Sequence, residues 1–257
     1  MGSRDTTRRR APHKGMKKES SCAPFVARIA APALAAAAPC TIAAAAEPTY
    51  ANLHGTIVLE NERVSVERFV IAPGQSTGRH TPGGNQLLVF IRGGFLASKA
   101  SGRAVWWRDG RVAWQSAGGA ADDGDVNAGS SPIELVWVTV KPVKQAAAKD
   151  APSSDRHLNY PNIPGEDLFE NDFVLVQRFT VGPGAWEGVH AHVPNTLYIH
   201  IHGGQWAVRS KHEPEHLYPE ASPDGEVGWQ DPIDISKGHE SGNVGKTTID
   251  LIWVTLK

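Results

Sequence analysis

The sequence predicts an all-β protein made of two tandem β-barrels or sandwiches, and three observations support this. Short runs of alternating or β-branched residues, such as 64–71 and 86–91, are separated by turns rich in Gly, Pro, Asn and Asp. No convincing amphipathic helix is found in the pattern. The same series of segments occurs twice, in residues 54–141 and 160–257. Many short strands with frequent turns, in two copies, are typical of small all-β domains.

The two copies match over most of their length. They align in three blocks, which pair residues 59–94 with 169–204, 110–115 with 225–230, and 133–141 with 249–257. Two units of this size indicate a duplicated domain, because a solenoid would show more and shorter repeats.

Residues 1–46 precede both copies and are expected to form a secretory signal peptide. A basic stretch that includes Arg8, Arg9 and Arg10 is followed by an Ala-rich apolar run, which ends in small residues before Glu47. This order is typical of export signals. The alternative, a buried Ala-rich helix, fits the prolines and flanking charges of the segment less well. The predicted location is therefore periplasmic or secreted.

Loss of residues 1–46 would change the charge of the chain. The whole chain has 26 Lys and Arg and 27 Asp and Glu; eight and two of these lie in residues 1–46, which leaves 18 and 25, a net charge of −7. Nucleic acid is therefore not an expected partner. Cys22 and Cys40 also lie in that segment, so we expect no disulfide and no thiolate metal site. No other segment is long and apolar enough to span a membrane.

The first copy, residues 54–141, is expected to be an N-terminal module. Residues 142–159 follow it and are polar, Ala-rich and interrupted by prolines, as is typical of a linker. The second copy, residues 160–257, is expected to be a C-terminal module that carries the functional site.

The most informative stretch of the C-terminal module is 184–203. His190 and His192 are two residues apart in an expected short strand, so their side chains point the same way and two imidazoles can bind one ion. A turn at 193–195 leads into a second expected strand, 197–201. A His-x-His pair alone is weak evidence, because such pairs are also common on surfaces and in cores.

The spacing around these histidines resembles the cupin superfamily. The spacing of Gly184, His190, His192, position 196 and Gly203 is similar to the first cupin motif. The segment from His239 to Asn243 is similar to the second. The resemblance covers nearly all of residues 54–257, so the chain looks like a bicupin. It implies two double-stranded β-helix barrels, with a metal inside a competent barrel.

Both modules depart from the cupin pattern. In the C-terminal module, Thr196 takes the position of the usual glutamate ligand. The N-terminal module keeps one histidine and loses the rest, with His80 retained, Pro82 at the second histidine, Gln86 at the glutamate, and Asp123 and Asn127 opposite His239 and Asn243. We therefore expect a metal in the C-terminal module and a metal-free N-terminal module.

The resemblance implies that His190, His192 and His239 bind a divalent transition metal: Fe, Cu, Mn, Ni or Zn. Three neutral ligands leave the charge of the ion uncompensated and leave positions open for an anionic substrate and O₂. This favours an oxygenase that acts on a small anionic organic molecule, as in three-histidine cupin dioxygenases. A non-catalytic binder of a small molecule or metal, and a metal-dependent lyase or isomerase, are the alternatives.

Tyr198 and Glu187 are the candidate catalytic residues. Tyr198 is on the same strand face as Thr196, as are His200 and His202, for which we expect a polar-lining or outer-shell role rather than ligation. Glu187 lies in the turn before the ligand strand and could supply an acid at the barrel mouth; the alternative is an exposed turn carboxylate. The expected partner is a small-molecule substrate, and a homo-oligomer is left open.

Overall fold

The computed structural model describes residues 50–257 apart from residues 120, 143–155 and 212. The predicted signal peptide, 1–46, and most of the predicted linker, 142–159, lie outside these residues. The described part consists of β-strands and one 3₁₀ turn, η1 (Ile235–Lys237), so the all-β class predicted from the sequence is confirmed. Within the described residues, no helix is long and apolar enough to cross a membrane.

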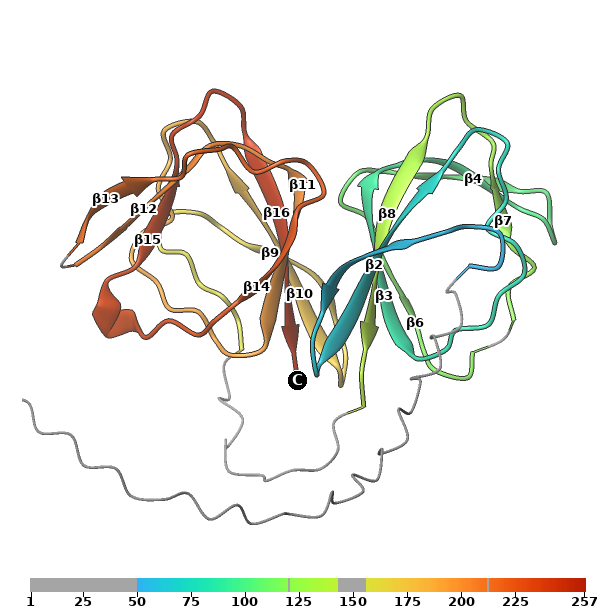
Figure 1. Cartoon of the computed structure of the whole chain (residues 1–257), viewed down its shortest axis with the longest axis horizontal. Helices are drawn as coiled ribbons and strands as arrows, with labels where there is room; N and C mark the ends of the chain where they lie inside the picture. The colour runs from blue at the N-terminus through green and yellow to red at the C-terminus, as the bar shows by residue number, and fades with distance from the viewer. Residues whose placement is uncertain (1–49, 120, 143–155, 212) are drawn as a thin grey trace, which may run out of the picture. The chain divides into compact units, whose positions relative to one another are not determined.

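The strands fall into two sets, one in each module (Figure 1). In the N-terminal module they are β1 (Thr56–Glu60), β2 (Val64–Ile71), β3 (Asn85–Arg92), β4 (Gly94–Ser98), β5 (Ala104–Trp107), β6 (Val112–Gln115), β7 (Asp125–Asn127) and β8 (Ile133–Val140). In the C-terminal module they are β9 (Glu166–Glu170), β10 (Val174–Val181), β11 (Thr196–His202), β12 (Trp206–Ser210), β13 (Glu213–Leu217), β14 (Val227–Gln230), β15 (Glu240–Asn243) and β16 (Ile249–Leu256).

Each module has a five-stranded and a three-stranded antiparallel sheet. The five-stranded sheets have the orders β1-β2-β8-β3-β6 and β9-β10-β16-β11-β14, so equivalent strands occupy equivalent places. The three-stranded sheets are β5-β4-β7 and β13-β12-β15. The last strand of each module pairs between the second and third strands rather than at an edge, which is the crossover expected of a double-stranded β-helix. The predicted pair of such barrels is confirmed.

The central strands of the five-stranded sheets are buried on both faces. All eight residues of β16 are buried, and so are most residues of β11. Alternate residues of β11, including Leu197 and Ile199, share one apolar cluster with residues of the N-terminal module such as Val66 and Val136. The other face of the strand lines the interior of its own barrel. Burial on both faces explains why β3 and β16 are nearly continuous apolar runs. β11 differs, because its inward-facing residues Tyr198 and His200 are polar.

Each barrel also buries the segment that precedes its first strand. Tyr50 and Leu53 belong to the inner core of the N-terminal barrel, and Leu158 and Tyr160 belong to that of the C-terminal barrel. Packing therefore begins before residues 54 and 160, at which we predicted the modules to start.

Arg68 of the N-terminal module reaches the C-terminal module, and both modules lie in one compact unit. Its guanidinium forms an ion pair with Glu134 and donates a long hydrogen bond, 3.5 Å, from Nη2 to the backbone oxygen of Asp224. It also packs on Gly225, where an ideal Cβ would lie 2.7 Å from Nη2. This glycine has φ of +75°. A residue with a side chain there would meet both backbone strain and Arg68.

The double burial of β11 leads to a prediction about stability. Leu197 is fully buried, whereas Leu217 in β13 is 56% exposed. We expect Leu197→Ala to lower the free energy of unfolding by about 2–5 kcal/mol, because it leaves a cavity between closely packed sheets. Leu217→Ala, the matched control, should change it by no more than about 0.5 kcal/mol. Urea denaturation of the two variants would measure this, and equal losses would contradict the assignment of Leu197 to the shared core.

Candidate metal centre

The three predicted ligands converge although none of them lies within a regular strand. His190 and His192 lie in the extended segment between β10 and β11, so the short strand predicted for them is wrong in detail. Backbone hydrogen bonds hold the segment instead. The N–H of His190 donates to the oxygen of His239 at 3.0 Å, and the N–H of His192 donates to that of Ile233 at 3.0 Å. Antiparallel pairing of this kind brings His239, just before β15, next to the other two histidines.

The ligand atoms of His190, His192 and His239 lie within 4.8 Å of one another. The centroids of their rings are 4.7–5.2 Å apart. His190 and His192 are buried, and His239 is half-buried at the edge of a cavity. Nitrogens gathered this closely could hold one metal ion, because metal–nitrogen bonds are about 2.0–2.1 Å long.

The protonation of these rings suits a cation. Burial lowers the pKa of His190 to about 4 and that of His192 to about 3, and it also lowers the pKa of His239. All three imidazoles are therefore neutral near pH 7, which is the form that binds a metal.

The hydrogen bonds of His190 and His192 also leave nitrogens for a metal. Nδ1 of His190 is 2.8 Å from the oxygen of Gly188; a carbonyl only accepts, so Nδ1 carries the proton and Nε2 carries a lone pair. Nε2 of His192 lies 3.0 Å from that lone pair, while its Nδ1 is buried without a hydrogen-bond partner among the described residues. A cation bound by both Nε2 atoms would remove the need for one ring to donate to the other. The hydrogen-bonding state of His190 and His192 therefore fits a bound metal ion.

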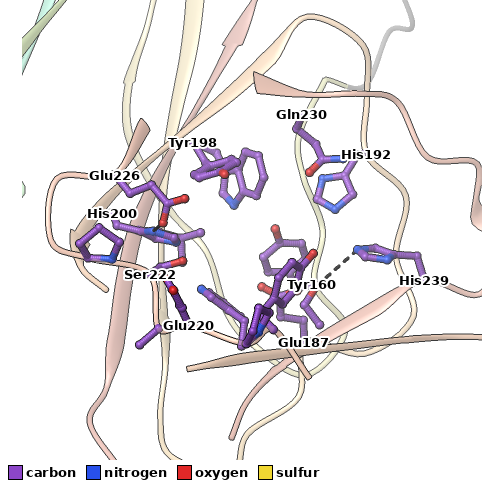
Figure 2. Close-up of a pocket in the computed structure, with 18 residues that line it drawn as sticks. Tyr160, Glu187, His192, Tyr198, His200, Glu220, Ser222, Glu226, Gln230 and His239 are labelled. Carbon is purple, nitrogen blue, oxygen red and sulfur yellow. Dashed lines mark hydrogen bonds and ion pairs between the residues drawn. The ribbon is translucent and has the colours of Figure 1, made fainter. Parts of the chain in front are cut away.

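A cavity of about 400 Å³ opens beside the histidines inside the barrel. Figure 2 shows His192 and His239 on one side of it, with Gln230 beside His192, and His200 and Glu226 on the opposite side. Its aromatic walls are formed by Tyr160, Tyr198, Trp206, Tyr218 and Trp253. The cavity can therefore take an organic molecule that reaches from the histidines to a second polar region.

Glu187 lines this cavity and is not an exposed turn residue. It is buried, and its Oε2 lies 3.7 Å from Nε2 of His190. Burial raises its pKa to about 8, against the hydrogen bonds from Ser241 that act to lower it. In the metal-free protein the carboxyl group is therefore mainly protonated near pH 7 and can donate a proton.

The remaining predicted residues divide between the cavity and the surface. Tyr198 and His200 line the cavity, as expected of strand neighbours on the face of Thr196. Thr196 is buried and its hydroxyl donates to the oxygen of Val193 at 3.0 Å. His202 does not reach the interior: its side chain is 51% exposed and lies 3.8 Å from Asp224. The strand has a bulge between His200 and His202 and ends there, so the predicted alternation does not carry His202 into the barrel.

One alignment between the modules needs correction. The backbone N–H of His80 donates to Asp122 at 3.0 Å, as that of His190 donates to His239. Asp122 rather than Asp123 therefore stands in the place of His239. The sequence alignment without gaps missed an extra residue in the loop near Gly124, and Asp123 is exposed near Arg79.

Several cavity residues were missed from the sequence, namely Tyr160, Trp206, Glu226 and Gln230. Tyr160 had a usable signal. The segment from Tyr160 to Gly165 repeats the Tyr-x-Asn-x-x-Gly pattern that starts at Tyr50, so the internal match begins earlier than the blocks aligned above. The other three lie in unremarkable strands and turns.

No protein-family model and no curated protein sequence matches the chain. Among solved structures, the "Putative Glyoxylate Induced Protein" from Pseudomonas aeruginosa is 13% identical, with a TM-score of 0.53 and 83% of each chain covered. The chain therefore shares the fold of this protein. The strand order of both modules is that of the double-stranded β-helix, which the resemblance to cupins implies.

Two further matches have lower TM-scores. A cupin 2 conserved barrel domain protein from Leptotrichia buccalis is 9% identical, with a TM-score of 0.46 over 82% of this chain and 92% of that one. A salicylate 1,2-dioxygenase from Pseudaminobacter salicylatoxidans is 10% identical, with a TM-score of 0.48 over 80% and 77%. Likenesses this weak carry no information on activity, so function has to be argued from the site itself.

The buried carboxyl of Glu187 predicts a pH effect in the metal-free protein. Its pKa of about 8 in the folded state lies above the ordinary value of 4.5. The protonated form is therefore favoured by folding, and the stability it contributes is complete below about pH 4.5 and is lost as the pH rises toward 8. Relative to Glu187→Gln, the wild type should lose stability over this window, by up to about 1.4 kcal/mol per pH unit.

Urea unfolding of the two metal-free proteins at several pH values tests this. Glu226→Gln serves as the control, because a hydrogen bond from His200 lowers the pKa of Glu226 from its ordinary value of 4.5. Its contribution to stability is lost only as the pH falls below that value, so its difference from wild type should stay constant from pH 4.5 to 8. A constant difference between wild type and Glu187→Gln from pH 4.5 to 8 would show that Glu187 is ionised in the folded protein.

Proposed function

We propose that the C-terminal barrel binds a divalent transition metal through His190, His192 and His239 and acts as an oxygenase on a small anionic organic molecule. The observation that carries the proposal is a contrast within the chain. Two barrels of the same strand order have different interiors. The C-terminal one holds three converging neutral imidazoles beside a cavity, and the N-terminal one holds packed apolar side chains.

Equivalent positions in the two barrels make this contrast specific. Tyr198, His200 and Trp206 take the places of Leu88, Phe90 and Leu96, which are core residues of the N-terminal barrel. His192 takes the place of Pro82. The fold can therefore form with an apolar interior. The polar, hollow interior of the C-terminal barrel should lower stability, and a ligand site would explain why it is there.

The residues of the site have separate tasks in this proposal. Gly188 fixes the ring of His190 through Nδ1, which is the support expected for a metal-ligating histidine. Glu187, when protonated, can give a proton to a group that becomes negative beside the histidines. The aromatic walls exclude water from the bound molecule. A bound metal would supply Lewis acidity and, if redox-active, the means to activate O₂.

An anionic molecule is favoured because the ligand set is neutral. Thr196 replaces a carboxylate ligand, and its hydroxyl is already bonded to Val193. Glu187 has a raised pKa. The positive charge of an ion bound here would therefore be left for the substrate to neutralise. Export remains a prediction from residues 1–46.

Metal content is the first test of the proposed function. His190→Ala or His239→Ala should abolish or greatly weaken metal binding, because each removes one of three protein ligands. Thr196→Ala should keep the metal, since Thr196 is not a ligand. His80→Ala is the matched control from the N-terminal barrel and should leave metal content unchanged. Metal analysis after reconstitution with iron, copper, manganese, nickel or zinc would measure these outcomes, and full occupancy in His190→Ala would refute the site.

Turnover separates an oxygenase from a binder. With metal bound, the wild type should consume O₂ only in the presence of a suitable small organic acid, and His190→Ala should lose this activity entirely. An oxygen electrode and a screen of organic acids, run in air and under anaerobic conditions, would test this. Tight ligand binding without O₂ uptake would indicate a binding protein, and product formation without O₂ would indicate a lyase or isomerase.

A further inference from the structure

A second polar cluster lies across the cavity from the three histidines. His200 is buried, and its Nδ1 is 3.3 Å from Oε2 of Glu226 (Figure 2). Glu226 also receives a hydrogen bond from Ser222. None of these residues is close enough to belong to the metal-ligand group. Their presence in the same cavity needs a separate explanation.

The pairing of His200 with Glu226 determines which ring nitrogen is left for a ligand. The hydrogen bond with His200 lowers the pKa of Glu226, so its carboxylate is charged and can only accept. Nδ1 of His200 therefore carries a proton and donates it. Nε2 is the nitrogen that remains, and no hydrogen bond to it is found within the described part of the chain.

The N-terminal barrel shows that this pair is not required by the fold. The N–H of His200 donates to the backbone oxygen of Glu226 at 2.9 Å, and that of Phe90 donates to Arg111 at 3.0 Å, so the positions correspond. Phe90 stacks on Trp107 with centroids 4.7 Å apart and planes at 20°. The buried imidazole of His200 in this place costs desolvation that the ring of Phe90 avoids.

The space for a ligand comes from the same replacement. An ideal Cβ on Gly93 would lie 1.8 Å from the oxygen of Trp107, and one on Gly203 would lie 1.8 Å from that of Ser222, so Ser222 takes the place of Trp107. The small side chain opens the cavity where the N-terminal barrel has an indole. The polar pair thus borders a space that a bound molecule can fill.

Aromatic contacts connect this pair to the metal ligands along one wall. The ring of His200 is 5.3 Å from that of Tyr198, which is 5.5 Å from Trp253, which in turn is 5.2 Å from His192. A molecule lying on this wall would have one end at the three histidines and the other at His200.

We propose that Nε2 of His200 accepts a hydrogen bond, and in the reaction a proton, from a hydroxyl or N–H group of the molecule in this cavity. Glu226 is a positioning residue that holds the required tautomer. When the proton moves, the O–H or N–H bond of the ligand breaks, its electron pair stays on the ligand atom, and an N–H bond forms at Nε2. The Glu226 carboxylate stabilises the resulting imidazolium. This inference rests on the proposed function for the reaction in which the proton moves and for the place of the other end of the molecule.

Phenol and anisole are suitable probes, because they differ in one donor hydrogen. With zinc-reconstituted protein at about pH 8, phenol should bind about 2- to 12-fold more tightly than anisole. His200→Phe, which introduces the residue of the other barrel, should abolish this preference. Glu226→Gln should reduce it. His202→Phe is the matched control on the same strand and should retain it. Titrations followed by NMR would measure all four.

Nitrogen-15 NMR of the wild type gives a readout that a purely structural role would not move. In the free protein Nδ1 of His200 should be protonated and Nε2 unprotonated; phenol should shift the Nε2 signal, and Glu226→Gln should change the proportion of tautomers. A protonated Nε2 in the free protein, equal or undetectable binding of the two probes, or a preference that survives in His200→Phe would overturn the proposal.

The same samples distinguish this failure from that of the metal site. Zinc content is measured separately, and absence of zinc from the wild type would refute the proposed metal site. The comparison of phenol with anisole is then repeated on metal-free protein, where the role of His200 is tested without the metal.

Discussion

Burial of the central strands on both faces is the constraint on which the structure depends. In β10, β11 and β16, one set of alternate side chains packs into the cluster shared by the two modules, and the other set faces a barrel interior. The shared cluster is wholly apolar, so its hydrophobic burial can offset an interior that is partly polar. Leu197, Ile199 and Ile201 occupy one face of the strand whose other face carries Tyr198 and His200. The strand can therefore serve stability and chemistry at once.

The N-terminal barrel indicates which features belong to the fold. Both barrels keep an asparagine whose amide donates to the same two backbone positions: Asn127 to Ile71 and Ser131, and Asn243 to Val181 and Thr247. This asparagine belongs to the second cupin-like motif, yet it also occurs in the barrel that keeps only His80 of the three histidines. Its role is therefore structural. The histidines and the cavity differ between the barrels, and the proposed function rests on them.

The sequence predicted the fold because its signals were redundant. Turn glycines, strand composition and the internal repeat all agreed, and a slip of one residue in any of them does not change the architecture. The three histidines were predicted from the resemblance to the two cupin motifs, whose residues can be read directly along the chain. The prediction of a short regular strand around His190 was wrong. The segment is extended, but it is held by single backbone hydrogen bonds to His239 and Ile233 from a distant part of the chain.

What the sequence did not predict depends on contacts between distant segments. Glu187 reads as a turn residue, and only the packing of His190 and Ser241 around it shows that it is buried. Glu226 reads as a turn residue as well, until His200 is placed beside it from another strand. His202 was predicted to face the interior but is exposed, because a bulge and the end of its strand interrupt the alternation. Local periodicity gives the face of a strand but not what covers that face.

The contact of Arg68 with the C-terminal module gives the N-terminal barrel a part in the site. Arg68 packs on Gly225 and reaches the oxygen of Asp224, and the next residue, Glu226, orients His200. The N–H of Gly225 donates to the oxygen of His200 at 2.8 Å, so the turn is tied to the strand that carries the imidazole. A side chain on Gly225 would displace Arg68 or the turn, and Glu226 would move with it. The turn that carries Glu226 is thus contacted by a residue of the N-terminal barrel, which has no histidine set of its own.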